Sequence, residues 1–158
     1  MFGNCITFEK FITKDRSNLV MLIKKSGITM KKVLVIDDDP MYHRIMQLML
    51  NKYQLFEPSF YFNATDVLDY LEKNRNTVNN LPDVIISDLS MPKMTGLKFL
   101  EMLKEIYPLL SKKIIIYIVS SSIDPQDLAC SKKYDFVKAY FVKPVTREIL
   151  MEIAQTPN

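Results

Sequence analysis

The 158-residue chain has little of several kinds of residue and segment, and each shortage excludes a class of protein. It has two cysteines, Cys5 and Cys130, which lack the number and spacing of a disulfide framework or a zinc site, so we expect free thiols. The longest unbroken apolar run, residues 114–119, is far shorter than the roughly 20 residues that a membrane-spanning helix needs. The amino-terminal stretch also lacks the apolar core and cleavage site of a signal peptide. These absences predict a cytoplasmic protein.

An excess of charge of one sign is also missing from most of the chain. Residues 1–29 hold five Lys/Arg against two Asp/Glu, whereas residues 30–158 hold sixteen of each. The lysines are scattered, and no series of aromatic residues lies between them, whereas a nucleic-acid-binding face gathers basic residues on one side. We therefore expect no direct binding of nucleic acid and none of a membrane.

The composition that remains fits one globular domain. Hydrophobic residues make up 48% of the chain, enough at this length to bury a two-sided sheet. Met30 is followed at once by two lysines and the first predicted strand. Our hypothesis is that the natural chain starts at Met30 and that residues 1–29 are an upstream extension or a disordered tail; a real extra helix packed on the domain is the alternative. The expected domain is residues 30–158, and its short end after the last predicted helix leaves no room for an output domain.

Short apolar runs alternate with helical patterns from residue 33 onward. The runs are rich in β-branched and aromatic residues and are too short for helices, which is typical of buried parallel strands. The alternation predicts an α/β fold, a doubly wound parallel sheet with helices on both faces. Five strands are predicted, at residues 33–36, 60–62, 83–87, 114–119 and 140–142.

Each predicted strand is followed by an amphipathic segment with its own start signal. The signals are polar side chains that cap a helix, or a proline in its first turn. The fourth helix is expected to end at about residue 133 and the last at about residue 154. The starts are Pro40, Asn63, Thr95, the pair Asp124-Pro125, and Thr146.

Three of the predicted strands end at charged residues. Asp37-Asp38-Asp39 follows the first strand, Asp88 the third and Lys143-Pro144 the fifth. In an open α/β sheet the carboxyl ends of the strands form the crevice in which ligands bind. Carboxylates far apart in the sequence could therefore meet around one cation, with a lysine opposite. This pattern predicts a site for phosphoryl chemistry.

In these residues the chain resembles the receiver domain of bacterial two-component response regulators. The resemblance covers about residues 31–155 and is carried by Asp37-Asp38, by Asp88 in the string DLSMPKMTG, by Ser120 and by Lys143-Pro144. Each motif alone is weak, but the set in this order at strand ends is a strong signal. The resemblance implies a flavodoxin-like (βα)5 fold with strand order 2-1-3-4-5. It also implies a phosphorylation-dependent signalling domain of a stand-alone, chemotaxis-regulator-like kind, which does not turn over an external substrate.

The resemblance also implies the phosphoacceptor and the metal ligands. Asp88 would take a phosphoryl group from a phosphohistidine, and Lys143 would supply a cation to the phosphoryl oxygens. Mg²⁺ prefers oxygen ligands, and Asp38 and Asp88 are expected as direct ligands, Asp37 as a water-mediated one and Ser90 through its backbone carbonyl. The expected donor is a sensor histidine kinase or a histidine phosphotransfer protein, and the downstream protein target is unknown.

The signalling switch implied by the resemblance is a hydroxyl and an aromatic ring. Ser120 would donate to the phosphoryl group, and Tyr140 would follow it inward and reshape the face of the fourth helix, fifth strand and fifth helix. Ser90 and Ser122 stand where the family tunes the lifetime of the phosphoryl group, and our hypothesis is that both admit water and keep that lifetime short. We expect Asp39 to cap the first helix, and His43, the sole histidine, to be an ordinary helix-surface residue without a role.

Two other readings of the residues stay open. A small phosphatase resembling the haloacid dehalogenase superfamily would use the Asp-x-Asp in residues 37–39, Ser120 and Lys143. That family also needs an acidic pair at a strand end, and here only Glu148 and Glu152 follow, both in the last predicted helix. The second reading is a pseudo-receiver, an interaction module that no longer takes phosphate, and the complete residue set argues against it.

Overall fold

The computed structural model describes residues 30–53 and 56–157. The predictions that concern residues 1–29, including the start at Met30 and the thiol of Cys5, lie outside the described residues. Cys130 is a free thiol, as expected. Within the described part of the chain, no helix is long and apolar enough to cross a membrane.

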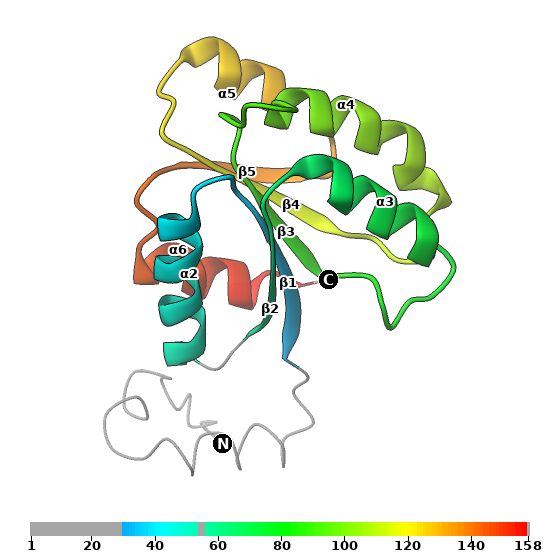
Figure 1. Ribbon diagram of the computed structural model, residues 1–158, viewed down its shortest axis with the longest axis horizontal. Helices are drawn as coiled ribbons and strands as arrows, with labels where there is room; N and C mark the ends of the chain where they lie inside the picture. Colours follow the sequence, from blue (N-terminus) through cyan, green and yellow to red (C-terminus); the bar gives the residue numbers. More distant parts are fainter. Residues whose placement is uncertain (1–29, 54–55, 158) are drawn as a thin grey trace, which may run out of the picture. The chain divides into compact units, whose positions relative to one another are not determined.

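The described chain folds into a five-stranded parallel sheet with helices on both faces, in the order β2-β1-β3-β4-β5 (Figure 1). The predicted α/β class and strand order are therefore confirmed. The strands are β1 (Lys31–Ile36), β2 (Phe56–Tyr61), β3 (Val84–Ser87), β4 (Ile115–Ser120) and β5 (Val137–Val142). The helices are α2 (Pro40–Tyr53), α3 (Ala64–Asn74), α4 (Gly96–Ile106), the 3₁₀ turn η2 (Tyr107–Leu109), α5 (Pro125–Ser131) and α6 (Arg147–Gln155).

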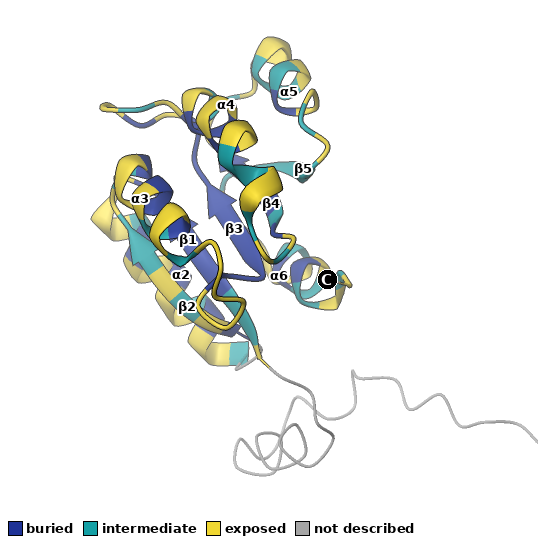
Figure 2. Ribbon diagram, turned by 90° about the vertical axis from the view of Figure 1, so that its right-hand side faces the viewer, coloured by how far each residue is buried: buried dark blue, intermediate teal, exposed yellow. Residues whose placement is uncertain are grey.

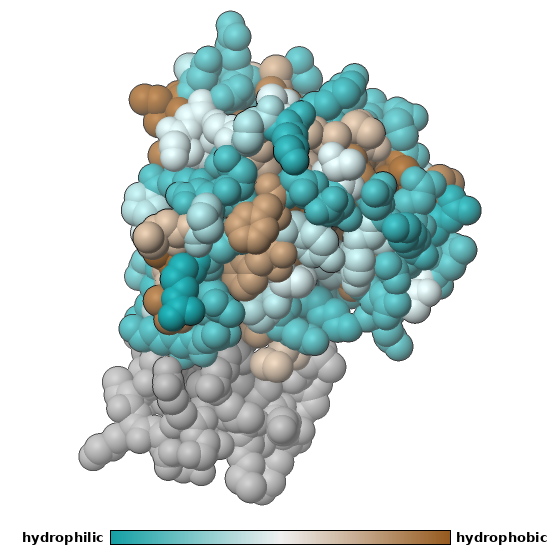
Figure 3. Space-filling model, viewed as in Figure 1, coloured by the Kyte–Doolittle hydropathy of each residue, from teal (hydrophilic) through white to brown (hydrophobic). Residues whose placement is uncertain are grey.

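Side chains that alternate along the central strands build two cores. Leu34 and Ile36 of β1 are buried on the face covered by α3 and α4, and Val33 and Val35 on the face covered by α2 and α6. Successive side chains of a strand point to opposite faces, so a strand buried on both faces must be apolar at every position. Figure 2 shows the central strands buried between helices whose outer sides are exposed. Figure 3 shows that hydrophilic side chains cover most of one face of the domain.

The edge strands are longer than the sequence predicts. β2 begins at Phe56 rather than at residue 60, and it includes Pro58, which pairs in register with Val33. A proline lacks the N–H of a ladder hydrogen bond, so it is tolerated in an edge strand, which has one unpaired side. β5, at the other edge, begins at Val137 rather than at residue 140. Both strands are partly exposed near their start, so polar and apolar residues mix there. The hydrophobic pattern of the sequence therefore does not show where either strand begins.

Side-chain caps begin each of the five described α-helices, as predicted. In three of them the capping side chain accepts a hydrogen bond from the third backbone N–H of the helix: Asn63 in α3, Thr95 in α4 and Thr146 in α6. In α5, Asp124 accepts from the second, the N–H of Gln126. Asp39 accepts from the N–H of Met41 at 2.8 Å, so its predicted capping role is also confirmed. These caps fix where the loops between strands and helices end, and the candidate site is built on those loops.

His43 does not lie on the helix surface, and that prediction was wrong. Its side chain is buried, with ring centroids 5.2 Å from Phe60 and 4.4 Å from Phe62. The imidazole packs as an aromatic ring between α2 and the end of β2. Sequence reasoning missed this because it placed a polar residue on the polar side of the helix.

Candidate functional site

Three carboxylates meet at the carboxyl edge of the sheet, where the sequence predicts them. Asp37 and Asp38 follow β1, and Asp88 follows β3, the strand that pairs with β1. One oxygen from each carboxylate lies within 4.8 Å of the others. Asp37 and Asp88 are buried and Asp38 is exposed, so the cluster opens to solvent on the Asp38 side. The backbone N–H of Asp88 donates to the carbonyl of Ile36 at 2.9 Å, which ties the two strand ends together.

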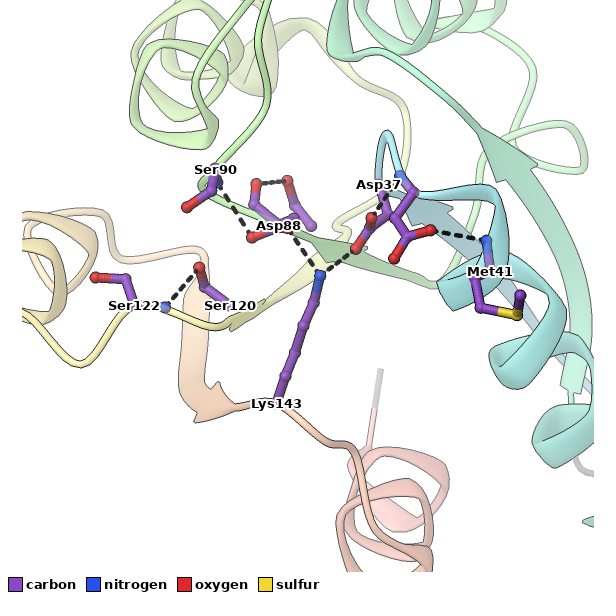
Figure 4. A network of polar contacts seen from close by, with 9 residues as sticks. Asp37, Met41, Asp88, Ser90, Ser120, Ser122 and Lys143 are labelled. Atoms are coloured by element: carbon purple, nitrogen blue, oxygen red, sulfur yellow. Dashed lines mark hydrogen bonds and ion pairs between the residues drawn. The ribbon is translucent and has the colours of Figure 1, made fainter.

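Lys143 brings a positive charge into this cluster from the end of β5. Its Nζ lies 2.6 Å from Asp37 Oδ2 and 2.8 Å from Asp88 Oδ2, and its side chain is 16% exposed (Figure 4). The backbone N–H of Lys143 donates to the carbonyl of Ser120 at 2.9 Å and so extends the pairing of β4 with β5. The sheet thus places residues that are 55 and 106 positions apart in direct contact.

The two buried carboxylates are not equivalent. Burial raises the pKa of both carboxyl groups. For Asp88 this effect is outweighed by the hydrogen bond and charge of Lys143, the N–H of Ser90 and the hydroxyl of Ser120, so the pKa of Asp88 is lowered. For Asp37 burial exceeds the effect of Lys143, and its pKa is raised. Burial lowers the pKa of Lys143, but its bonds to both carboxylates reverse this, and its pKa is raised. At neutral pH the site holds an ionised Asp88 beside an ammonium.

The loop after β3 supports Asp88 and includes Ser90. The N–H of Ser90 donates to Asp88 Oδ1 at 3.1 Å. The loop closes onto α4, where the N–H of Gly96 donates to the carbonyl of Leu89 at 3.0 Å. A Cβ at Gly96 would lie only 2.3 Å from the carbonyl oxygen of Asp88, so this position requires glycine. Sequence reasoning assigned no role to this glycine, although it stands in the string that carries the resemblance.

Ser120 and Tyr140, the predicted switch residues, lie on the neighbouring strands β4 and β5. Ser120 is buried at the end of β4, and its Oγ accepts from the N–H of Ser122 at 3.3 Å. The hydroxyl of Tyr140 donates to the backbone carbonyl of Ser122 at 2.8 Å. Both residues therefore contact the same loop, between β4 and α5. The hydroxyl of Ser122 donates to Asp127 Oδ2 at 2.6 Å and so ties this loop to α5.

Tyr42 is a site residue that sequence reasoning missed. Its ring centroid lies 4.1 Å from Nζ of Lys143. Tyr42 stands in the first turn of α2, so its only signal in the sequence is its closeness to the aspartates. Whether a residue of that turn faces the lysine depends on how the helix packs on the sheet, which no local pattern specifies.

The donor set suits a small hard cation. Three carboxylates against one ammonium leave excess negative charge, and carboxylate oxygens are the ligands that Mg²⁺ takes in proteins. The ammonium of Lys143 already lies between two of them. The residues therefore fit a divalent metal, which would add to the positive charge that Lys143 brings.

The fold and the site define a class of protein: a parallel five-stranded α/β domain with an acidic cluster and one lysine at the carboxyl edge of its sheet. The family model of the response regulator receiver domain matches residues 33–155. The chain belongs to this family, and it is a signalling domain of the two-component kind. The family match does not favour the phosphatase reading.

Named relatives agree with this assignment. The two-component response regulator ORR1 of Oryza sativa subsp. japonica is 31% identical over 107 residues, which are 65% of this chain and 44% of that protein. The chain thus spans less than half the length of that relative. A response regulator receiver domain protein from Clostridium thermocellum is 28% identical, with a TM-score of 0.64, over 79% of this chain and 90% of that one. The Mn²⁺-bound form of response regulator Rcp1 has the same fold, with 23% identity and a TM-score of 0.61 over 79% and 89% of the chains.

Proposed function

We propose that Asp88 accepts a phosphoryl group from a phosphohistidine and that the domain signals through this modification. The observation that carries the proposal is the contact of Asp88 with Lys143, beside two further carboxylates. Asp88 is the buried carboxylate whose pKa is lowered, so it is ionised and can act as a nucleophile at neutral pH. The ammonium 2.8 Å away can stabilise the charge of the phosphoryl oxygens during transfer.

The proposed transfer forms one bond and breaks one. An oxygen of Asp88 attacks the phosphorus, and the bond between phosphorus and the donor imidazole nitrogen breaks with its electron pair staying on nitrogen. The imidazole, protonated at its other nitrogen, leaves as a neutral ring, and Asp88 carries an acyl phosphate. Lys143 and the hydroxyl of Ser120 bind oxygens of the transferred group, and the chemistry depends mainly on positioning and charge.

We further propose that Mg²⁺ is the cofactor. Asp38 and Asp88 would bind it directly, Asp37 through water, and Ser90 through its backbone carbonyl. When bound, the ion offsets the repulsion between the carboxylates and the incoming phosphoryl group. The Mn²⁺ named for Rcp1 supports a divalent ion at the corresponding kind of domain.

The proposed output runs from Ser120 to Tyr140. Phosphorylation would draw the Ser120 hydroxyl toward Asp88 and loosen the loop that Tyr140 now contacts. The ring of Tyr140 would then move inward and change the face formed by α5, β5 and α6, where a downstream protein target binds. The shared contact of both side chains with Ser122 supports this coupling.

The proposed donor is a sensor histidine kinase or a histidine phosphotransfer protein. Helix α2 supports a protein donor, because it leaves an apolar stripe exposed directly after the aspartates. Met41 is 65% exposed, Ile45 48% and Leu48 58%, at helical spacing along one side. A helix of the donor packed on this stripe would bring its histidine close to Asp88. The domain would then act as a phosphoacceptor and not as an enzyme on an external substrate.

Binding of beryllofluoride, a phosphoryl mimic, tests the proposal. With Mg²⁺ present, we expect the parent protein to bind it and to show chemical-shift changes that spread from Asp88 to Tyr140. We expect Asp88→Asn to show none, because its neutral amide lacks the ionised carboxylate that would bind the mimic. Asp69→Asn, an exposed carboxylate change on α3, is the matched control and should behave as the parent. Equal binding by Asp88→Asn, or radiolabelled phosphate attached elsewhere, would reject the assignment.

A further inference from the structure

Among the described residues, the ammonium of Lys143 contacts two carboxylates and one aromatic ring. It contacts Asp37 at 2.6 Å and Asp88 at 2.8 Å, and it lies over the ring of Tyr42 with Nζ 4.1 Å from the centroid. A cation within about 6 Å of a tyrosine centroid is attracted by the electron-rich face of the ring, more strongly when both groups are away from water. Lys143 is only 16% exposed, so this attraction is weakly screened.

The hydroxyl of Tyr42 does not explain why a tyrosine ring stands here. Its oxygen is buried and has no hydrogen-bond partner within the described residues. Burial, with the negative charges of Asp37 and Asp88, raises the pKa of Tyr42, so the ring stays a neutral phenol. A buried hydroxyl without a partner is unfavourable, which leaves the ring face as the favourable contact toward the site.

We propose that Tyr42 is a positioning residue for Lys143. Its ring confines the flexible lysine side chain, so that the ammonium stays beside Asp88 ready to receive phosphoryl oxygens. A lysine has several rotatable bonds, and restricting them before the reaction reduces the entropy lost in reaching the transition state. The expected effect on the rate of phosphorylation rests on the proposed function, whereas the contact of Tyr42 with Lys143 does not.

Two variants separate the ring from the hydroxyl. Tyr42→Phe keeps the ring and removes the unpartnered hydroxyl, whereas Tyr42→Leu removes the ring and keeps an apolar side chain. Tyr53→Leu, a ring change at the far end of the same helix, is the matched control. Tyr42→Met is a second ringless variant in case Tyr42→Leu does not fold, and amide NMR spectra check that each variant is folded.

The first readout is the NMR signal of the Lys143 side chain in the unphosphorylated protein. Protons above a ring face are shifted upfield, so we expect an upfield shift of the methylene next to Nζ in the parent, Tyr42→Phe and Tyr53→Leu. We expect the shift to be absent in Tyr42→Leu and Tyr42→Met. An unchanged shift in the ringless variants would overturn the inference without any assay of phosphorylation.

The second readout is the rate of labelling at Asp88 by a small-molecule phosphoryl donor with Mg²⁺. We expect Tyr42→Leu to be about three- to tenfold slower than the parent, the range that the strength of a cation–π contact allows. Tyr42→Phe should be within about twofold of the parent. Parental rates in the ringless variants, or equal slowing in Tyr42→Phe, would overturn the positioning role. A parent that takes no label at Asp88 would reject the proposed function instead, and the NMR shift would still decide the contact.

Discussion

At the scale of single residues, the site depends on two carboxylates that share one ammonium but differ in acidity. Asp88 accepts from the N–H of Ser90 and contacts Lys143, and together with the nearby hydroxyl of Ser120 these neighbours lower its pKa. Asp37 is more affected by burial than by Lys143, and its pKa is raised. Neighbours that push two carboxyl groups apart in pKa assign them different tasks. The lowered pKa suits Asp88 to the attack that we propose, whereas Asp37 holds the ammonium of Lys143 in place at 2.6 Å.

His43 allows a prediction about stability and pH. Burial lowers the pKa of His43, so the folded protein binds the imidazole proton less tightly than the unfolded chain does. The fold is therefore most stable while the imidazole is neutral, above the ordinary histidine pKa of about 6.5. This stability is lost as the pH falls below that value, because the unfolded chain takes up the proton first. We expect His43→Phe to remove this loss. It also replaces a buried Nε2 that has no partner within the described residues, which should raise the free energy of unfolding at pH 7.5 by about 1 kcal/mol.

Urea unfolding of both proteins at pH 7.5 and pH 5.5 measures this effect. The chain has one histidine, so no second imidazole titrates between these values. The parent should lose more stability than His43→Phe over this interval. A variant that loses as much as the parent would show that the imidazole of His43 is not the group responsible.

At the scale of elements, the start of α4 and the loop after β3 fit together only because residue 96 is glycine. Alanine at the first position of a helix is usually as good as glycine or better. At Gly96, however, a Cβ would lie 2.3 Å from the carbonyl oxygen of Asp88 and 2.8 Å from Cα of Leu89. Both are backbone atoms, so the loop itself would have to move. Steric conflict therefore outweighs helix propensity.

We predict that Gly96→Ala lowers the free energy of unfolding by about 1–3 kcal/mol, the usual cost of overpacking. Because the displaced atoms belong to Asp88 and Leu89, the variant should also bind beryllofluoride more weakly. Lys98→Ala, an exposed position in the same helix, is the control and should change both properties little. Urea unfolding and beryllofluoride titration test this, and a Gly96→Ala protein as stable as the parent would contradict the tight contact.

The sequence predicts some elements and contacts better than others, for physical reasons. Asp37, Asp88 and Lys143 could be expected to meet, because parallel strands end at one edge of a sheet and each residue directly follows a strand. The edge strands were predicted too short, because Pro58 and half-exposed residues break the apolar pattern. The contact of Tyr42 with Lys143 could not be predicted, because it depends on the packing of α2 against the sheet.

At the scale of the whole domain, the acidic cluster would link the proposed metal binding to folding. Three carboxylates come close only when β1 and β3 are paired, so a metal at this site binds the folded form and not the unfolded chain. At ten times its dissociation constant, such a ligand stabilises the fold by about 1.4 kcal/mol.

We predict that Mg²⁺ raises the unfolding temperature of the parent and of Asp69→Asn, and raises that of Asp38→Asn much less. Asp38 is the exposed member of the cluster, so its loss should disturb the apo fold little. Thermal unfolding followed by circular dichroism, with and without Mg²⁺, measures the increment. Sodium chloride at matched ionic strength separates binding from screening, and an equal rise with either salt would contradict a specific metal site.

The position of Lys143 has a consequence for the resting domain. Its side chain serves as a built-in counterion, so two buried carboxylates can be accommodated before any solute arrives. If a metal and a phosphoryl group bind as we propose, charge partners would be exchanged: Lys143 would release Asp37 and contact the new anion. Next to Asp88, the resting and modified forms would thus differ first by a swap of ion pairs around Lys143, and the loop after β4 would respond to that swap.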